Sequence, residues 1–509
     1  MNKGKVWLVG AGPSDVGLFT LKGKQVLEQA EVVVYDALVG HGVLAMVPKT
    51  AELVDVGKRA GNHTLPQEQI NEVLLKKALE GKRVVRLKGG DPFLFGRGGE
   101  ELELLVENDI PFEIVPGVTS AISVPAYNGI PVTHRDFCSS LHIITGHKKK
   151  GKEYNIDFEA LVRTKGTLVF LMGISAMEDI CNGLMSAGMS PDTPAAVLQK
   201  GTSARQKKVV ATVSTLKAAS DAAKIETPAI IIVGKVCTVS NQFAWYEKLP
   251  LQGCRVLVTR PKELASRMAE QLREKGAEVV ELPAIQTEAI SDNAELEKAM
   301  EKLESYQWVV FTSQIGVRIF FESLRRAKVD LRKMSRVKIA VIGKGTKAEV
   351  EKYGMFADFV PSVYDGETLG KELAEICEGG EHILIPRARI GSQELVKELQ
   401  AVKDVTIDDI ATYDTVLVKS HLIDERKEFA AGNMDYAIFT SASTVRGFAA
   451  ATEGLDYSTV EAVCIGRQTA EEAEKLGMKI HISKVASIAS VTELTEELFA
   501  AKKAENQAK

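Results

Sequence analysis

The sequence lacks the patterns that mark several large classes of protein. Its six cysteines are scattered and contain no C-x-x-C pair, which argues against a disulfide framework, a zinc site or an iron–sulfur cluster. No segment reaches the ~18 apolar residues that a membrane span needs. The early apolar run Val6–Val9 breaks at Gly10 and is too short for a signal peptide. We therefore expect a soluble protein of the reducing cytoplasm with no resident metal.

A strong excess of one charge is also missing. The chain has 64 lysines and arginines against 68 aspartates and glutamates, a formal net charge of −4. Overall electrostatics give no reason to expect nucleic acid or an anionic membrane as a partner. Recognition of any polyanion must therefore depend on local groups of cations.

A dinucleotide-binding fingerprint is incomplete as well. Gly10 and Gly12 follow a strand-like run, but the pattern G-x-G-x-x-G requires a third glycine where Asp15 stands. The sequence thus disfavours a Rossmann dehydrogenase.

The chain does have a regular alternation of short apolar runs with longer amphipathic stretches. Runs such as 32–35, 84–87 and 230–233 predict strands, and stretches such as 67–80 and 99–108 predict helices. This alternation is typical of α/β domains. With 509 residues, the chain is long enough for about three or four of them.

The most informative segment is 87–101. Five glycines, together with Asp91 and Pro92, directly follow the strand-like run 84–87. Glycine lets a backbone approach a ligand closely, and ligands of open α/β sheets bind where the strands end. The segment therefore predicts a ligand-binding loop.

Five further segments accompany this loop in a fixed order: 9–15, 35–39, 56–61, 115–121 and 129–135. Together with 87–101 they resemble the tetrapyrrole methylases, most closely the uroporphyrinogen-III C-methyltransferases. That family transfers methyl groups from S-adenosylmethionine to a macrocycle with eight carboxylates. The resemblance covers roughly residues 3–245.

The resemblance implies which residues hold S-adenosylmethionine. They are Pro13, Gly89, Gly90, Asp91, Leu94, Thr119, Ser120, Met172 and Gly201. Met172, considered alone, fits an ordinary core methionine equally well. Ser14 departs from the glycine that is usual in the family.

Two residues match the family's presumed proton-transfer groups. Asp36, directly after the apolar run 32–35, matches the proton acceptor, and Lys58 matches the donor. The acceptor carbon becomes cationic as the methyl group adds, so a nearby anion and a base both serve the reaction. Without the resemblance, Asp36 fits a helix N-cap and Lys58 a solvated lysine equally well.

A substrate with eight carboxylates also needs cations around it. Arginine in particular forms paired hydrogen bonds with carboxylates. Any single one of the basic residues near the glycine-rich segments also fits an ordinary surface charge. The candidates for substrate binding are Arg59, His63, Arg97, His134 and Arg135.

Beyond residue 253 the chain repeats itself. Val256–Pro261 matches Ile383–Ala388, and Phe311–Ser313 returns as Phe439–Ser441. Such a repeat predicts two related α/β lobes that face each other across a cleft. The pattern resembles uroporphyrinogen-III synthase over roughly residues 253–499.

The second resemblance implies its own site residues. Tyr413 matches a tyrosine thought to assist loss of a hydroxyl as hydroxymethylbilane closes into a ring, although alone it fits an ordinary strand tyrosine. Hydroxyl side chains after strands in both lobes are candidate carboxylate ligands, and N-capping explains each of them individually. They are Thr312, Ser313, Thr440, Ser441, Ser443 and Thr469.

We therefore expect an α/β chain with a two-subdomain tetrapyrrole methylase fold, followed by a two-lobed α/β synthase fold with an internal repeat. The predicted bounds are 1–245 for the methylase (subdomains about 1–115 and 116–245), 246–253 for a linker, 254–499 for the synthase (lobe one about 254–285 plus 416–499, lobe two about 286–415) and 500–509 for a flexible tail.

The expected function is bifunctional. The synthase half would make uroporphyrinogen III, and the methylase half would methylate it twice to precorrin-2, on the branch toward sirohaem or cobalamin. The resemblance also implies a homodimer formed through the methylase half. Two alternatives stay open: C-terminal lobes that sense tetrapyrroles without catalysis, and an N-terminal half that methylates another corrin precursor or a protein residue.

Overall fold

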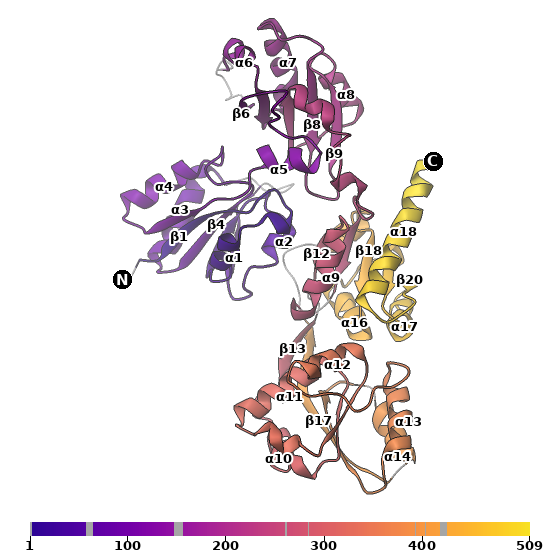
Figure 1. The fold of residues 1–509 in the computed structure, drawn as a ribbon. Helices are drawn as coiled ribbons and strands as arrows, with labels where there is room; N and C mark the ends of the chain where they lie inside the picture. Colours follow the sequence, from indigo (N-terminus) through magenta and orange to yellow (C-terminus); the bar gives the residue numbers. More distant parts are fainter. Residues whose placement is uncertain are drawn as a thin grey trace.

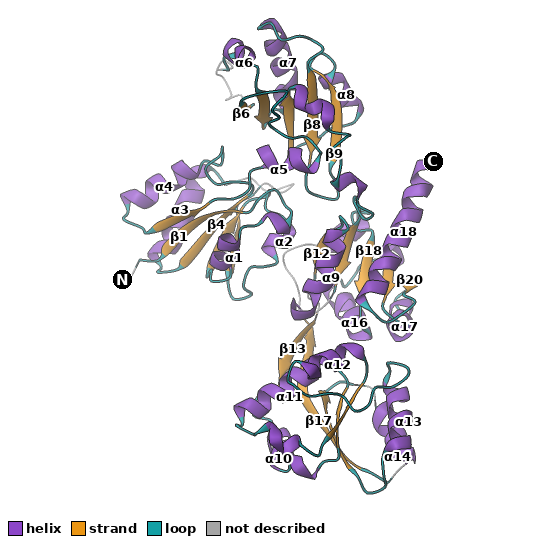
Figure 2. Ribbon diagram, in the orientation of Figure 1, coloured by secondary structure: helices purple, strands orange, loops and turns teal. Residues whose placement is uncertain are grey.

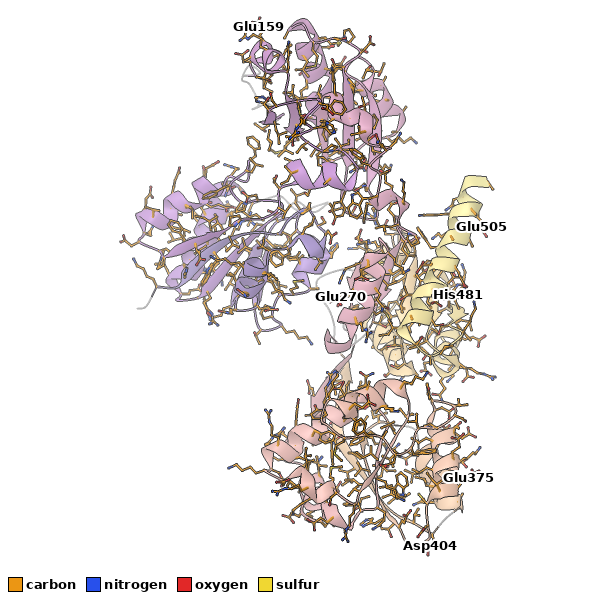
Figure 3. The ribbon with its side chains drawn as sticks, in the orientation of Figure 1. Glu159, Glu270, Glu375, Asp404, His481 and Glu505 are labelled. Atoms are coloured by element: carbon orange, nitrogen blue, oxygen red, sulfur yellow. The ribbon has the colours of Figure 1, made fainter. Side chains whose placement is uncertain are left out.

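The computed structural model describes residues 3–57, 65–146, 156–259, 262–282, 285–391, 393–402, 404–417 and 425–508. Its described strands form four five-stranded sheets, and Figure 1 shows the four α/β bodies built on them. The first two sheets belong to the N-terminal half and the last two to the C-terminal half. Charged side chains such as Glu159 and Glu375 point outward from these bodies (Figure 3).

The first sheet is wholly parallel, with the order β3-β2-β4-β1-β5. Alternate residues of its central strands enter two apolar cores, one on each face, so helices cover the sheet on both sides. Its strands are β1 (Lys5–Gly10), β2 (Val32–Tyr35), β3 (Glu52–Asp55), β4 (Arg83–Lys88) and β5 (Phe112–Val115). Its helices are η1 (Val16–Leu18), α1 (Leu21–Leu27), α2 (His41–Leu44), α3 (Gln67–Leu79) and α4 (Gly98–Glu107).

The second sheet is mixed, with the order β6-β7-β10-β8-β9 and only the β6–β7 pair parallel. Its strands are β6 (Leu141–Thr145), β7 (Thr167–Leu171), β8 (Pro194–Gln199), β9 (Lys207–Thr212) and β10 (Ala229–Val233). Its helices are α5 (Ser120–Tyr127), α6 (Phe158–Thr164), η2 (Ile174–Ala176), α7 (Met177–Ser186), α8 (Leu216–Ala222) and η3 (Lys235–Val239).

The connection between the halves is packed against both of them. Beside η4 (Tyr246–Lys248), Trp245 and Tyr246 form an aromatic cluster with Tyr127 of α5, with ring centroids 4.9–5.6 Å apart. The indole of Trp245 donates to the Ala126 carbonyl at 2.9 Å, and the Leu251 amide donates to the Lys275 carbonyl at 2.8 Å. The connecting segment is therefore held to the methylase half by aromatic packing and to the synthase half by a backbone hydrogen bond.

The third sheet, which with its helices we call lobe one, is parallel with the order β12-β11-β18-β19-β20. Its strands are β11 (Arg255–Val258), β12 (Glu278–Glu281), β18 (Tyr436–Phe439), β19 (Glu461–Cys464) and β20 (Lys479–Ile482). Its helices are α9 (Lys262–Glu274), α15 (Glu425–Ala430), α16 (Ala442–Ala451), η7 (Tyr457–Thr459), α17 (Arg467–Glu474) and α18 (Ile488–Ala508).

The fourth sheet, lobe two, has the order β13-β17-β16-β14-β15, and only β13 runs antiparallel to its neighbour. Its strands are β13 (Ile285–Ala289), β14 (Trp308–Phe311), β15 (Lys338–Val341), β16 (His382–Ala388) and β17 (Thr406–Leu417). Its helices are α10 (Ala294–Glu301), η5 (Leu303–Ser305), α11 (Gln314–Arg326), η6 (Leu331–Met334), α12 (Lys344–Glu351), α13 (Gly366–Ile376) and α14 (Glu394–Val402).

The repeat seen in the sequence is a repeat of topology. The neighbours β11-β18-β19 of lobe one correspond to β16-β14-β15 of lobe two. Equivalent serines begin the equivalent helices: Ser313 accepts from the Gly316 amide at the start of α11, and Ser441 accepts from the Thr444 amide at the start of α16. The expected α/β class, with a two-lobed second half, is therefore confirmed, and Figure 2 shows the mixture of helix and strand in every body.

Candidate active site

A cavity of about 880 Å³ lies between the first two sheets and extends to lobe one. Loops at the carboxyl ends of β1, β2 and β4 form one wall, as the general rule for open parallel sheets predicts. Loops after β7 and β8 form the opposite wall. All nine residues predicted to hold S-adenosylmethionine line this cavity: Pro13, Gly89, Gly90, Asp91, Leu94, Thr119, Ser120, Met172 and Gly201.

Glycine backbone from three segments meets at the wall formed by the first sheet. The amide of Gly90 donates to the Gly12 carbonyl at 2.8 Å, and the amide of Gly12 donates back at 3.2 Å. A Cβ added at Gly10 would lie 2.5 Å from the Gly117 Cα and 2.6 Å from the Gly90 oxygen. The three segments can meet this closely only because Gly10 and Gly117 carry no side chains at the crossing.

Asp91 holds the glycine-rich loop in shape. One carboxylate oxygen accepts from the amides of Phe93 (2.8 Å) and Leu94 (3.0 Å), and the other accepts from the Gly117 amide at 3.0 Å. These bonds tie the loop after β4 to the loop after β5. Asp91 therefore organises the cavity wall, in addition to lining it.

The opposite wall is set by steric contacts and an unusual backbone. A Cβ at Gly201 would lie 2.3 Å from a Val124 methyl group on α5, so this position has no room for a side chain. Met172 has a φ of +56° and is 49% exposed. It is therefore not an ordinary buried core methionine. Its flexible thioether instead faces the cavity.

A buried cluster of charges lies behind Asp36. The carboxylate of Asp36 accepts from the Leu38 amide at 3.0 Å and lies 3.6 Å from the Arg86 guanidinium. One oxygen of Glu101, a fully buried residue, accepts from Arg86 at 3.1 Å and from Lys88 at 2.7 Å. Two cations and two carboxylates thus balance beside the cavity, where an unpaired charge would be costly.

This environment changes the pKa of Lys88. Burial, reinforced by the charge of Arg86, lowers the pKa of its ammonium group, although Glu101 opposes the shift. The charged state of Lys88 therefore depends on the carboxylate of Glu101.

A second group of predicted residues meets in lobe two. The hydroxyl of Tyr413 on β17 lies 2.8 Å from the hydroxyl of Ser313, and Tyr413 is only 6% exposed. Burial raises the pKa of Tyr413, and the hydrogen bond with Ser313 counteracts this. In lobe one the hydroxyls of Ser441 and Ser443 lie 2.8 Å apart, and α16, which they begin, packs against β13 and β17.

Comparison with known proteins matches each half to a family model. Residues 5–217 match the tetrapyrrole (corrin/porphyrin) methylases, and residues 266–493 match uroporphyrinogen-III synthase HemD. The porphyrin biosynthesis protein HemD of Ruminiclostridium josui is 46% identical over 498 residues, which are 98% of this chain and 99% of that protein. The chain belongs to the family of fused tetrapyrrole methylases and uroporphyrinogen-III synthases.

Two further relatives match the methylase half. The S-adenosyl-L-methionine-dependent uroporphyrinogen III methyltransferase of Methanosarcina barkeri is 52% identical over 236 residues, 46% of this chain and 92% of that protein. The crystal structure of uroporphyrin-III C-methyl transferase from Thermus thermophilus complexed with S-adenyl homocysteine is 38% identical, with a TM-score of 0.40; the match covers 46% of this chain and all of that one.

The remaining predicted residues of the methylase half are in different places. Arg97 lines the cavity and forms a 2.5 Å ion pair with Glu100. His134, which stacks on Phe137, and the exposed Arg135 are not among the residues that line it. Lys58, Arg59 and His63 lie outside the described residues.

In the synthase half, Ser313 and Ser441 serve as helix caps, as the simpler interpretation predicted, whereas Ser443 lies in the first turn of α16. Thr312 and Thr440 are partly buried at the ends of β14 and β18, and Thr469 is buried in the first turn of α17. Capping and ligand binding are compatible, since a helix N-terminus also offers unpaired amides. The binding roles of these hydroxyls stay predictions.

Sequence reasoning missed the buried cluster. Arg86 and Lys88 alternate with apolar residues along β4, so they point to the same face of a strand that is otherwise buried. Two cations on one face of an apolar strand are the signal that could have revealed them. Their partner Glu101 lies in the first turn of α4, 13 residues beyond Lys88 in the sequence, and reaches them only through tertiary packing.

Strained backbone is concentrated around the methylase cavity. Among the described residues, six of the eleven non-glycine residues with positive φ line it: Ser14, Phe95, Arg97, Met172, Lys200 and Thr202. Such conformations typically cost about 1–3 kcal/mol each. Ser14, which replaces the usual family glycine, has a φ of +108°, where glycine is favoured.

We therefore predict that Ser14→Gly stabilises the protein by about 1 kcal/mol, because relief of strain exceeds the extra entropy that glycine gives the unfolded chain. Chemical denaturation of the full chain measures this difference. The control is Ser139→Gly, whose backbone does not have positive φ and which we expect to destabilise slightly. Equal effects of the two substitutions would contradict the strain argument.

Proposed function

We propose that the chain closes hydroxymethylbilane to uroporphyrinogen III in its synthase half and methylates that product twice, to precorrin-2, in its methylase half. The observation that carries the proposal is the convergence of all nine predicted S-adenosylmethionine residues on one cavity. The backbone crossing at Gly10, Gly90 and Gly117 supports it further, because it leaves amides and carbonyls, not side chains, beside a ligand.

In the methylase half, the wall residues of the cavity orient the reactants. S-adenosylmethionine, when bound, supplies an electrophilic methyl group. Orientation of donor and acceptor carbon can contribute ~7–11 kcal/mol to such a displacement. Asp36 supports the positive charge that develops on the pyrrole and accepts the proton that the ring then loses. Lys58 stays the predicted proton donor.

The buried cluster keeps Asp36 suited to this task. Arg86 is held by Glu101 on one side and lies 3.6 Å from Asp36 on the other. Amides of Leu38 and Gly89 contact the other carboxylate oxygen at 3.0 and 3.4 Å. The carboxylate is thereby fixed in orientation and remains 25% exposed toward the cavity.

In the synthase half, Tyr413 assists departure of the hydroxyl group of the substrate. Burial raises the pKa of Tyr413, so its hydroxyl is protonated at neutral pH and can donate a hydrogen bond to the leaving oxygen. Ser313, 2.8 Å away, fixes the orientation of this hydroxyl. Hydroxyls and helix N-termini of both lobes bind the substrate carboxylates.

The proposal includes the cellular setting. Within the described part of the chain, no helix has the length and apolar character needed to cross a bilayer. We propose a cytoplasmic homodimer formed through the methylase half, where exposed apolar side chains such as Phe93 and Ile122 support an interface. Tetrapyrroles are the proposed partners, without nucleic acid.

The test is incubation of the purified protein with hydroxymethylbilane, with and without S-adenosylmethionine, and separation of the oxidised products. We expect type III isomer without the methyl donor and dimethylated product with it. Only type I isomer, together with methylation of added uroporphyrinogen III, would favour the sensor alternative. Failure to methylate uroporphyrinogen III would favour another acceptor.

We expect Asp36→Asn to reduce the methylation rate by about 10²–10⁴-fold, because asparagine keeps the contacts to Leu38 and Gly89 but cannot accept the proton. Single-turnover methylation of uroporphyrinogen III measures the loss. Synthase activity and binding of S-adenosylhomocysteine in the same variant should be unchanged. Asp157→Asn, which alters the cap of α6, is the matched control and should leave methylation intact.

We expect Tyr413→Phe to slow formation of the type III isomer by about 10²-fold and to raise the share of type I product, because spontaneous closure then competes. The isomer ratio measures the effect. Tyr306→Phe, which removes another buried hydroxyl of lobe two, one bonded to Asp408, is the control. A normal isomer ratio in Tyr413→Phe would contradict the assigned role.

A further inference from the structure

The loop 200–206 forms a part of the cavity wall and has a strained backbone. It joins β8 to β9, and it lines the cavity through Lys200, Gly201 and Thr202 among others. Lys200 and Thr202 both have positive φ, at 45° and 68°. Strained residues of this kind persist where the surrounding contacts hold them in place.

The methylase half supplies some of these contacts. The hydroxyl of Thr202 donates to the Pro13 carbonyl at 2.8 Å. The side chain of Gln206 accepts from the Thr202 amide at 2.9 Å and donates to the Tyr127 carbonyl at 3.2 Å. These bonds fix both ends of the loop, but not its middle.

Lobe one of the synthase half contacts the middle of loop 200–206, at Ala204 and Arg205. A carboxylate oxygen of Glu278, on β12, accepts from the Ala204 amide at 3.0 Å. Glu428, on α15, lies 3.6 Å from the guanidinium of Arg205. Two elements that are far apart in the sequence, β12 and α15, therefore contact the loop.

Arg255 connects the two glutamates. Its guanidinium donates to the other oxygen of Glu278 at 2.9 Å and also pairs with Glu428. The side chain of Arg255 is only 6% exposed, whereas Glu278 and Glu428 are 28% and 24% exposed. Two cations, Arg205 and Arg255, balance two anions, so the network is neutral and partly shielded from solvent.

Lobe one also lines the same cavity directly. Arg255, Glu278 and Val279 are among its lining residues, together with Gly201 and Ser203 of the loop. The methylase cavity thus has a wall that the isolated methylase sequence would lack.

We propose that the ion network of Arg255, Glu278 and Glu428 positions loop 200–206, so that binding of the methyl donor depends on lobe one of the synthase. Glu278 and Arg255 are positioning residues for methyl transfer, although they belong to the other enzyme of the chain. The inference rests on the proposed methyltransferase function and extends it.

Glu278 offers a graded test. Glu278→Ala removes both the acceptor for the Ala204 amide and the charge beside Arg255, whereas Glu278→Gln keeps an acceptor oxygen. By calorimetric titration of the full chain with S-adenosylhomocysteine, we expect binding to Glu278→Ala to be about tenfold weaker than to wild type, with Glu278→Gln between the two. The KM for S-adenosylmethionine should rise in parallel, with little change in kcat.

Glu461→Ala is the matched control. Glu461, on β19, pairs with Lys479 and His481 of β20, at the edge of the lobe one sheet opposite to β12, and Figure 3 shows His481 there. Formation of type III isomer reports on the fold of the synthase half in every variant and should be unchanged.

Binding within twofold of wild type in Glu278→Ala would overturn the inference, and so would an equal loss in Glu461→Ala. Wild-type protein that does not bind S-adenosylhomocysteine would instead remove the methyltransferase proposal, and the inference with it. The two failures are therefore distinguishable.

Discussion

Close backbone contact at one point sets the geometry of the methylase half. The end of β1 and the loops after β4 and β5 meet at Gly10, Gly90 and Gly117, and a Cβ added at Gly10 or Gly117 would lie 2.2–2.7 Å from backbone atoms of the neighbouring segments. Asp91 fixes the same arrangement by accepting from the Gly117 amide. Displacement of one loop by a side chain would displace the others, because interiors packed at this density cannot absorb an extra methyl group. The approach of Gly12 and Gly90, which both line the cavity, accompanies this contact.

Charge balance is a second constraint, and it acts at two places beside the cavity. Asp36 and Glu101 balance Arg86 and Lys88 behind one wall. Other pairs balance where lobe one meets loop 200–206. Breaking a buried pair leaves an uncompensated charge, which costs more than the intact pair contributes. Both networks are thus better suited to fixing geometry than to adding stability.

Much of this could be predicted from the sequence, for physical reasons. Helix and strand periodicity located elements such as α3 and β4 to within a residue or two, and the repeat correctly implied two lobes with equivalent strand neighbours. Glycine-rich loops were informative because close approach demands glycine. The nine residues assigned to S-adenosylmethionine do line one cavity, whereas His134 and Arg135 are not among its lining residues, and their roles stay predictions.

What the sequence could not indicate were contacts between distant segments. Glu101 is an ordinary acidic residue of an amphipathic helix until α4 packs beside β4. Glu278 and Glu428 likewise have no distinctive sequence context, and only the packing of the two halves brings them to Ala204 and Arg205. Such residues carry no local signal, since their importance arises only from tertiary packing.

The order in which the contacts can form has a consequence for biosynthesis of the chain. Domains generally fold as units from the N-terminus during translation. The methylase half can therefore fold as soon as it has left the ribosome, but loop 200–206 must wait for Glu278, 74 residues beyond Ala204, and then for Glu428. Lobe one itself needs β18 to β20, which follow lobe two. A nascent methylase half would thus lack part of its cavity wall until translation of the synthase is nearly complete.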